Sequence, residues 1–173
     1  DRWVHPALFF FLGGLLLPLL RGKAKKGLLL LIPLLSIISV TLTQYGQYGQ
    51  YHFLNIVGLF GRVDRLSMVF AWVFVIMAFL GALYSLHREE DGHHIAGFLY
   101  VGGSLGAVFA GDYLTLFIFW EIMAFSSVFL IWYRKTQQST DAGFRYLLVH
   151  VFGGLCFFTG MVLYYGKTGN LAF

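Results

Sequence analysis

Two ionisable residues lie inside long apolar segments, where membrane helices normally carry none. Glu121 is the ninth residue of segment 113–133, and His150 is the eighth residue of segment 143–165. A carboxylate at the centre of a bilayer costs about 2.5–3.5 kcal/mol on insertion scales, so such a residue is by default a candidate for function. An imidazole has an ordinary pKa of about 6.5 and changes its charge close to neutral pH. Both are residue types that a proton relay needs.

The Glu121 carboxyl has no partner within its own helix. The residues three and four positions away are apolar, namely Phe117, Ile118, Ala124 and Phe125. The partner must therefore come from another helix, or the group is neutral for part of the time. Burial raises the pKa of a carboxyl and a nearby cation lowers it, so a carboxyl under both influences exchanges protons near neutral pH. The alternative is a protonated Glu121 that donates an interhelical hydrogen bond.

Glycines on two segments predict close helix contacts. Gly153 and Gly154 follow His150 by three and four residues, and Gly102 and Gly106 form a small-xxx-small pattern. Small residues at such positions let a neighbouring helix approach closely. His150 itself is open to a second reading, as a neutral histidine bonded to a backbone carbonyl.

Other polar residues are weaker candidates. Asp112 directly precedes an apolar segment and is typical of a helix N-cap, and Arg145 can extend its charge to the interface. Either could also line the mouth of an ion path.

The run HREEDGHH at 87–94 has no ordered zinc spacing, so a solvated loop is favoured over a metal site. With one cysteine and no nucleotide-binding motif, we expect no cofactor, no metal and no catalytic centre of the chain's own.

The composition requires a membrane protein. Of 173 residues, 58% are hydrophobic and 12% are charged, against about 25% charged in soluble domains. A soluble enzyme, a disordered chain and a disulfide scaffold are excluded. The sequence predicts an all-α integral membrane protein with one transmembrane domain over 1–173 and six helices. The expected spans are 4–20, 27–43, 66–86, 95–110, 113–133 and 143–165.

Basic residues mark the expected orientation. Eight Lys and Arg residues, Arg145 among them, lie in the first, third and fifth connections, and four lie elsewhere, Arg2 among them. The excess places these three connections in the cytoplasm and both termini on the outer face. The net charge of +4 is therefore a topology signal, and we expect no nucleic-acid partner. The connection 44–65 contains the repeat QYGQYGQY and is expected to be extended or hairpin-like.

Segment 111–133, GDYLTLFIFWEIMAFSSVFLIWY, resembles the fifth helix of antiporter-like membrane subunits. These are the large proton-channel subunits of respiratory complex I, the Mrp-type sodium/proton antiporter subunits D and A, and the membrane arms of energy-converting hydrogenases. The resemblance rests on the Asp that opens the helix and on the Trp120-Glu121 pair. GRVDRLSMVFAW at 61–72 and ALYSLH at 82–87 resemble the third helix, and FRYLLVHVFGG at 144–154 resembles the sixth.

The resemblance implies a role for Glu121. In that family the helix-five Glu pairs with a Lys on the seventh helix, and the pair gates proton movement along a line of water, Lys and His. His150 corresponds to a polar residue of the sixth helix in the Mrp-like branch. Family members have more than a dozen helices in two repeats, so the chain is expected to be a fragment or a split part of a longer subunit.

The sequence leaves two alternative functions, of which the first is favoured. The first is a proton or cation/proton translocating subunit, or part of one, in the inner or cytoplasmic membrane of a prokaryote. Its partners would be other membrane subunits, the lipid bilayer and protons, with sodium left open as a second ion and with membership of a redox-driven translocase also left open. The second is a structural membrane anchor that docks partner subunits without conducting protons.

Overall fold

Six α-helices and one β-hairpin make up the fold of the computed structural model, which describes residues 3–173. Asp1 and Arg2 lie outside the described residues, and with them one of the basic residues counted above. The elements are α1 (Pro6–Leu16), α2 (Lys23–Leu42), β1 (Gly46–Phe53), β2 (Ile56–Val63), α3 (Arg65–Tyr84), α4 (Asp91–Phe109), α5 (Tyr113–Trp132) and α6 (Gln137–Thr168). Two short 3-10 helices, η1 (Leu17–Leu19) and η2 (Ser85–His87), extend α1 and α3.

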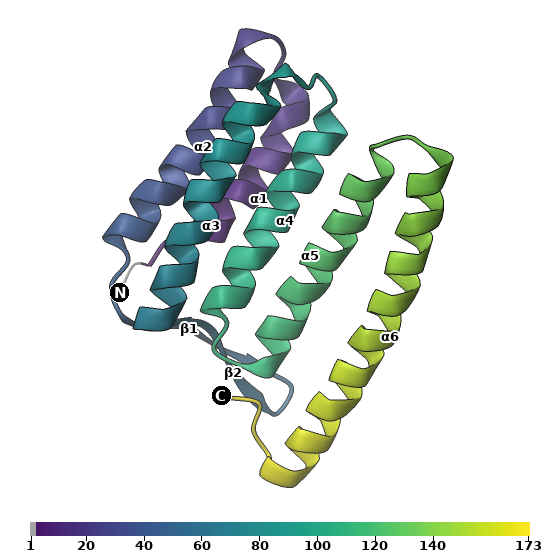
Figure 1. Ribbon diagram of the computed structural model, residues 1–173. Coiled ribbons are helices and arrows are strands. Elements are labelled where there is room, and N and C mark those ends of the chain that lie inside the picture. The colour runs from purple at the N-terminus through teal and green to yellow at the C-terminus, as the bar shows by residue number, and fades with distance from the viewer. Residues whose placement is uncertain (1–2) are drawn as a thin grey trace.

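The helices form a bundle with one outlying member. The first four helices lie together, α5 runs beside α4, and α6 lies on the far side of α5 (Figure 1). Phe10, Leu29, Leu105 and Phe109 are fully or almost fully buried between α1, α2 and α4. By contrast α6 packs mainly on α5, and Phe152 on its outer face is 70% exposed. The bundle core therefore lies among the first four helices.

Local sequence signals set where the helices begin. Pro6 occupies the first turn of α1, where its missing N–H is not needed. Asp64 and Thr136 cap α3 and α6, each in a reciprocal arrangement with the serine three residues later. The Thr136 cap starts α6 six residues before the apolar segment predicted at 143–165. Residues 137–142, which are polar except for Ala142, therefore extend this helix beyond its apolar part.

The connection 44–65 forms an antiparallel hairpin at one end of the bundle. Strands β1 and β2 pair from Gly46 opposite Val63 to Phe53 opposite Ile56, which leaves a two-residue turn. The hairpin lies against the α4–α5 turn, where the Gly111 amide donates to the Leu59 carbonyl at 3.2 Å. The C-terminal segment that follows α6 returns to the same place (Figure 1).

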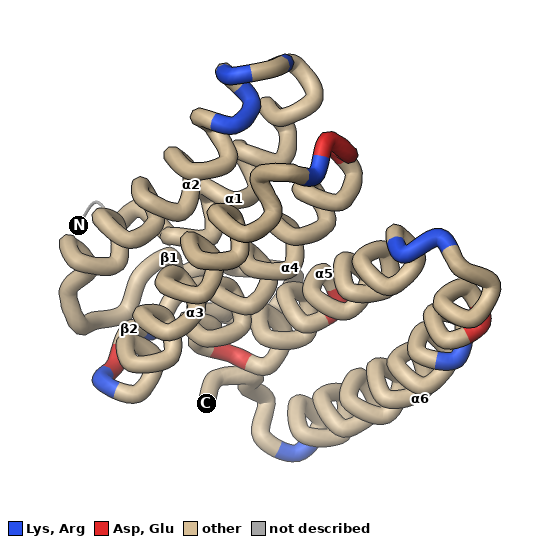
Figure 2. The backbone as a smooth tube through the Cα atoms, turned by 45° about the horizontal axis from the view of Figure 1, so that its top comes forward, with Lys and Arg blue, Asp and Glu red and all other residues tan. Residues whose placement is uncertain are grey.

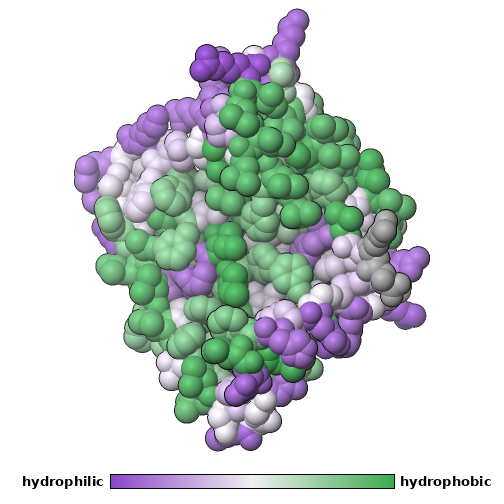
Figure 3. All heavy atoms as spheres, turned by 180° about the vertical axis from the view of Figure 1, so that it is seen from behind, coloured by the Kyte–Doolittle hydropathy of each residue, from purple (hydrophilic) through white to green (hydrophobic). Residues whose placement is uncertain are grey.

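Within residues 3–173, four helices are long and apolar enough to cross a bilayer, by length and composition. They are α2, α3 with its 3-10 extension, α5 and α6, while Pro6–Leu19 is apolar but shorter. Helix α4 is not among the four, and it opens with Asp91, His93 and His94. Hydrophobic side chains cover most of the face drawn in Figure 3, between ends that carry hydrophilic residues.

Candidate functional site

Glu121 and His150 meet between α5 and α6. The Glu121 Oε1 and His150 Nε2 atoms are 3.4 Å apart, within ion-pair range, and the side chains are 26% and 12% exposed. The separation is longer than a usual hydrogen bond, and Nε2 has no hydrogen-bond partner among the described residues. Both residues were identified from the sequence as separate candidates, but their contact was not. The interhelical neighbour expected for Glu121 is thus His150 of α6.

A glycine makes room for this contact. Gly154 lies one helical turn after His150, and a Cβ built there would lie 2.7 Å from Glu121 Oε1. Any larger residue at 154 would occupy the space that the carboxylate uses. Gly153 differs, because a Cβ at that position meets no atom within 4 Å. Of these two glycines of α6, only Gly154 faces α5 closely in the described structure.

Aromatic and hydroxyl groups surround the imidazole. The Tyr146 ring is stacked on the His150 ring with centroids 6.3 Å apart, and the Trp120 ring lies at the same distance in an edge orientation. The Ser127 Oγ is 2.8 Å from the Tyr146 hydroxyl. Polar groups therefore continue from Glu121 through His150 and Tyr146 to Ser127, towards the α5–α6 connection. Tyr146 was missed from the sequence, although it lies one turn before His150.

The Glu121 carboxyl also borders a cavity on the other side of α5. This cavity of about 470 Å³ is lined by residues of α1, α4 and α5 that are apolar except for Ser126 and Glu121, and Glu121 is the one ionisable residue among them. Phe11 and Leu99 line it from α1 and α4. Glu121 therefore lies between an imidazole on one side and an apolar space on the other.

Asp112 is held by structural contacts. It is 0% exposed, and its carboxylate accepts hydrogen bonds from the Thr115 amide at 2.7 Å and the Leu59 amide at 2.6 Å. The Tyr51 hydroxyl donates to the same carboxylate at 3.1 Å. Burial raises the pKa of Tyr51 above its ordinary value of 10.0, so the hydroxyl stays protonated and remains a donor. The predicted N-cap is confirmed, and the same carboxylate ties the hairpin to α5.

The other predicted residues lie apart from the Glu121–His150 contact. Arg145 is exposed on α6. Gly102 and Gly106 of α4 face α1 and α5, where a Cβ would lie 2.9 Å from the Phe11 ring and 2.2 Å from the Phe119 ring. Their small size therefore serves packing within this chain.

The run at 87–94 is partly helical, since α4 begins at Asp91. His94 is buried, and its Nε2 lies 2.8 Å from the Arg88 carbonyl oxygen. Within residues 3–173 no group of three or more His, Cys, Asp or Glu side chains is placed to hold a metal ion.

Comparison with known proteins gives matches in sequence and in fold. Residues 110–173, which include both Glu121 and His150, match the family described as NADH:quinone oxidoreductase/Mrp antiporter, transmembrane. The Na⁺/H⁺ antiporter subunit A1 of Staphylococcus aureus (strain JH9) is 31% identical over 107 residues, which is 58% of this chain and 13% of that subunit.

Two solved structures share the fold over 96% of this chain. One belongs to the membrane-bound sulfane sulfur reductase, an archaeal respiratory membrane complex, with a TM-score of 0.82 and 24% identity. The other belongs to respiratory complex I from Thermus thermophilus, with a TM-score of 0.71 and 24% identity. The chain spans 37% of the length of each of these two chains. The chain is therefore similar in sequence, over residues 110–173, to the NADH:quinone oxidoreductase/Mrp antiporter family, and similar in fold to chains of these two respiratory complexes.

Proposed function

We propose that the chain is a proton-translocating subunit, or part of one, of an Mrp-type antiporter or of a complex I-like or hydrogenase-like membrane arm. The observation that carries the proposal is the 3.4 Å approach of Glu121 to His150 between two apolar helices. A carboxyl and an imidazole at this distance can share one proton. The shared proton leaves the pair without net charge in either position, so the pair avoids the cost of an isolated charge in an apolar interior.

The hydroxyl groups next to this pair suggest the route by which a proton would reach it. A proton that reaches His150 from the Tyr146 side gives an imidazolium beside the Glu121 carboxylate, and transfer from Nε2 to Oε1 leaves both groups neutral. The hydroxyls of Tyr146 and Ser127, 2.8 Å apart, provide hydrogen-bonding groups between the pair and the α5–α6 connection. Glu121 and His150 are therefore proposed as the relay. Asp112 and Arg145 remain proposals for the mouth of an ion path, with Asp112 also acting as a cap.

The proposed membrane arrangement uses all six helices as spans. Lys and Arg residues gather at the end of the bundle that carries the α1–α2, α3–α4 and α5–α6 connections (Figure 2). By the positive-inside rule, this end would face the cytoplasm of a prokaryote and both termini would lie on the outer face. The partners would be further membrane subunits, because the relatives belong to multisubunit complexes. The ion would be the proton, with sodium as an open second ion.

The test is transport by the complete complex in inverted membrane vesicles. Glu121→Gln and His150→Asn should each lower proton-coupled transport by about ten-fold or more, equivalent to about 1.4 kcal/mol or more of barrier. Asp141→Asn is the matched control, because Asp141 is an exposed carboxyl on α6. Assembly of the complex is measured in parallel. Full transport by an assembled Glu121→Gln variant would disprove the relay.

A structural anchor is the second candidate function. The observation in its favour is the exposure of α6, because only 6% of its most apolar stretch is buried in the described structure. An anchor predicts that Glu121→Gln leaves transport unchanged, while bulky polar substitutions of exposed α6 residues such as Phe152→Gln detach partner subunits. Both variants in one transport and assembly assay distinguish the two functions.

A further inference from the structure

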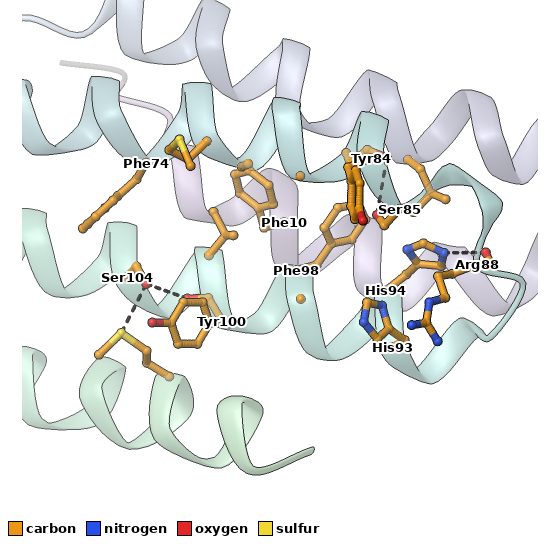
Figure 4. A pocket seen from close by; sticks show the side chains of 18 of the residues that line it. Phe10, Phe74, Tyr84, Ser85, Arg88, His93, His94, Phe98, Tyr100 and Ser104 are labelled. Carbon is orange, nitrogen blue, oxygen red and sulfur yellow. Dashed lines mark hydrogen bonds between the residues drawn. The ribbon is translucent and has the colours of Figure 1, made fainter. Parts of the chain in front are cut away.

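A large cavity lies between α3 and α4, at the end of the bundle that carries their connection. Its volume is about 570 Å³, within the range of about 300–1,000 Å³ usual for small-molecule sites. Phe10, Phe74 and Phe98 line it from three different helices (Figure 4). Most of its wall is apolar. The cavity therefore suits a hydrocarbon chain rather than a polar solute.

The mouth of this cavity is basic. Arg88, His93 and His94 stand together at the end where η2 passes into α4 (Figure 4). The His94 Nε2 lies 2.8 Å from the Arg88 carbonyl, a contact that holds the backbone of Arg88 against α4. The Arg88 side chain is exposed and forms no ion pair with any carboxylate of residues 3–173. A free guanidinium thus stands beside an apolar cavity.

A second cleft continues from the same arginine. It has a volume of about 370 Å³ and shares Arg88 and Leu29 with the cavity. Within it Lys25 forms an ion pair with Asp91 and donates a hydrogen bond to the Glu89 carbonyl at 2.6 Å. Its other charged lining residues are three cations and one acid, namely Arg21, Lys26, Arg88 and Glu89. The cleft therefore carries a net positive charge.

We propose that the α3–α4 cavity and the basic cleft together bind one anionic glycerophospholipid. An acyl chain lies in the cavity, the phosphate contacts Arg88, and the remaining headgroup enters the cleft beside Lys26. Basic pockets between membrane helices commonly bind acidic lipid headgroups. A free anion would leave the apolar cavity unused, and an uncharged apolar molecule would leave the cations unused. A phospholipid would occupy both features, with its acyl chain in the apolar cavity and its headgroup at the basic cleft.

The test measures lipid retained by the purified complex that contains this chain. Native mass spectrometry compares phosphatidylglycerol with phosphatidylcholine after detergent exchange. We expect phosphatidylglycerol to be retained at least about five-fold more strongly, since each Lys or Arg near the surface contributes about 1 kcal/mol towards anionic lipid. Arg88→Gln should remove most of this preference. Arg134→Gln, which removes another exposed basic residue near the same end, is the matched control.

A second variant tests the acyl-chain part independently. Gly97 lines the cavity, and a Cβ at this position meets no atom within 4 Å, so Gly97→Leu adds an apolar side chain at a position of the cavity wall where the Cβ has room. This variant should lower retention of either lipid, while Gly160→Leu on α6, where a Cβ also meets no atom within 4 Å, should not. Intact assembly of each variant is checked by size-exclusion chromatography.

Three outcomes would overturn the proposal. Equal retention of the two lipids by the unmodified complex would exclude selection of an anionic headgroup. Release of phosphatidylglycerol by millimolar inorganic phosphate would assign the cations to a free anion. Unchanged retention in both Arg88→Gln and Gly97→Leu would place any bound lipid elsewhere. The readout is lipid binding, so each outcome is independent of proton transport.

Discussion

The Glu121 carboxylate occupies the space that a side chain at position 154 would fill. A Cβ on Gly154 would lie 2.7 Å from Glu121 Oε1, while the His150 Nε2 lies 3.4 Å from the same oxygen. The imidazole and the glycine are one turn apart on α6. The glycine therefore determines whether the carboxylate can reach the histidine.

Gly154→Ala should consequently impair transport while leaving both ionisable residues in place. The added methyl group displaces the Glu121 carboxylate, and a displacement of about 1 Å in a reacting group can lower a rate by roughly a hundred-fold. We expect a loss of about ten- to a hundred-fold in proton-coupled transport by vesicles. Gly153→Ala is the matched control, because a Cβ there meets no atom within 4 Å. Equal activities of the two variants would contradict the assigned role of Gly154.

The two ionisable residues could be identified from the sequence because a charge inside an apolar segment is a local signal. Their contact could not, because it depends on how α6 rotates and docks on α5. The same limit explains why Tyr146 was missed. Its ring lies on the His150 ring, but a tyrosine in an apolar helix has many other uses. The position of Tyr146 in the packed helices, and not its residue type, sets it apart from other tyrosines.

The helices themselves were largely predictable, whereas their ends were less so. Hydrophobicity locates the apolar part of each helix, but caps locate its start. Thr136 and Ser139 cap each other's backbone and begin α6 well before the predicted position 143. At α5 the cap and the apolar segment coincide, and the predicted start at 113 matches the helix. The contacts of Asp112 with the hairpin lay outside prediction, because they join residues 53 to 61 positions apart.

Removal of the Tyr51 hydroxyl should loosen the hairpin. This hydroxyl donates to the buried Asp112 carboxylate at 3.1 Å, and hydrogen bonds to charged groups contribute about 1.5–3 kcal/mol. Tyr51→Phe should lower the stability of the complex by an amount in this range and speed proteolytic cleavage within 44–65. Tyr45→Phe is the control, since Tyr45 is 65% exposed. Equal cleavage rates in the two variants would rule out the tie to Asp112.

A methyl group at Gly106 should disturb the packing of α4 on α5. A Cβ there would lie 2.2 Å from the ring of Phe119, which is itself 6% exposed and cannot move into solvent. Overpacking of this kind costs about 1–3 kcal/mol. We expect Gly106→Ala to lower the melting temperature of the purified complex. Gly97→Ala on the same helix should not, because a Cβ at Gly97 meets nothing within 4 Å. A melting temperature unchanged by Gly106→Ala would show that α4 and α5 are less closely packed.

The cap at Asp64 should make the start of α3 sensitive to acid. The hydrogen bond from the Ser67 amide, at 2.8 Å, holds the pKa of the Asp64 carboxyl below its ordinary value of 3.8. Because the folded pKa is the lower one, the stabilisation is fully present above pH 3.8 and is lost as the pH falls through the folded pKa. Asp64→Ala should therefore cost about 0.5–2 kcal/mol near pH 7, measured by thermal unfolding of the complex. The difference from the unmodified protein should shrink below about pH 4, because protonation then weakens the cap in the unmodified protein as well.

Asp64→Asn, which keeps an accepting oxygen, should retain most of the stability near pH 7. A difference between Asp64→Ala and the unmodified protein that stays constant as the pH falls would show that ionisation of the carboxyl adds nothing to the cap.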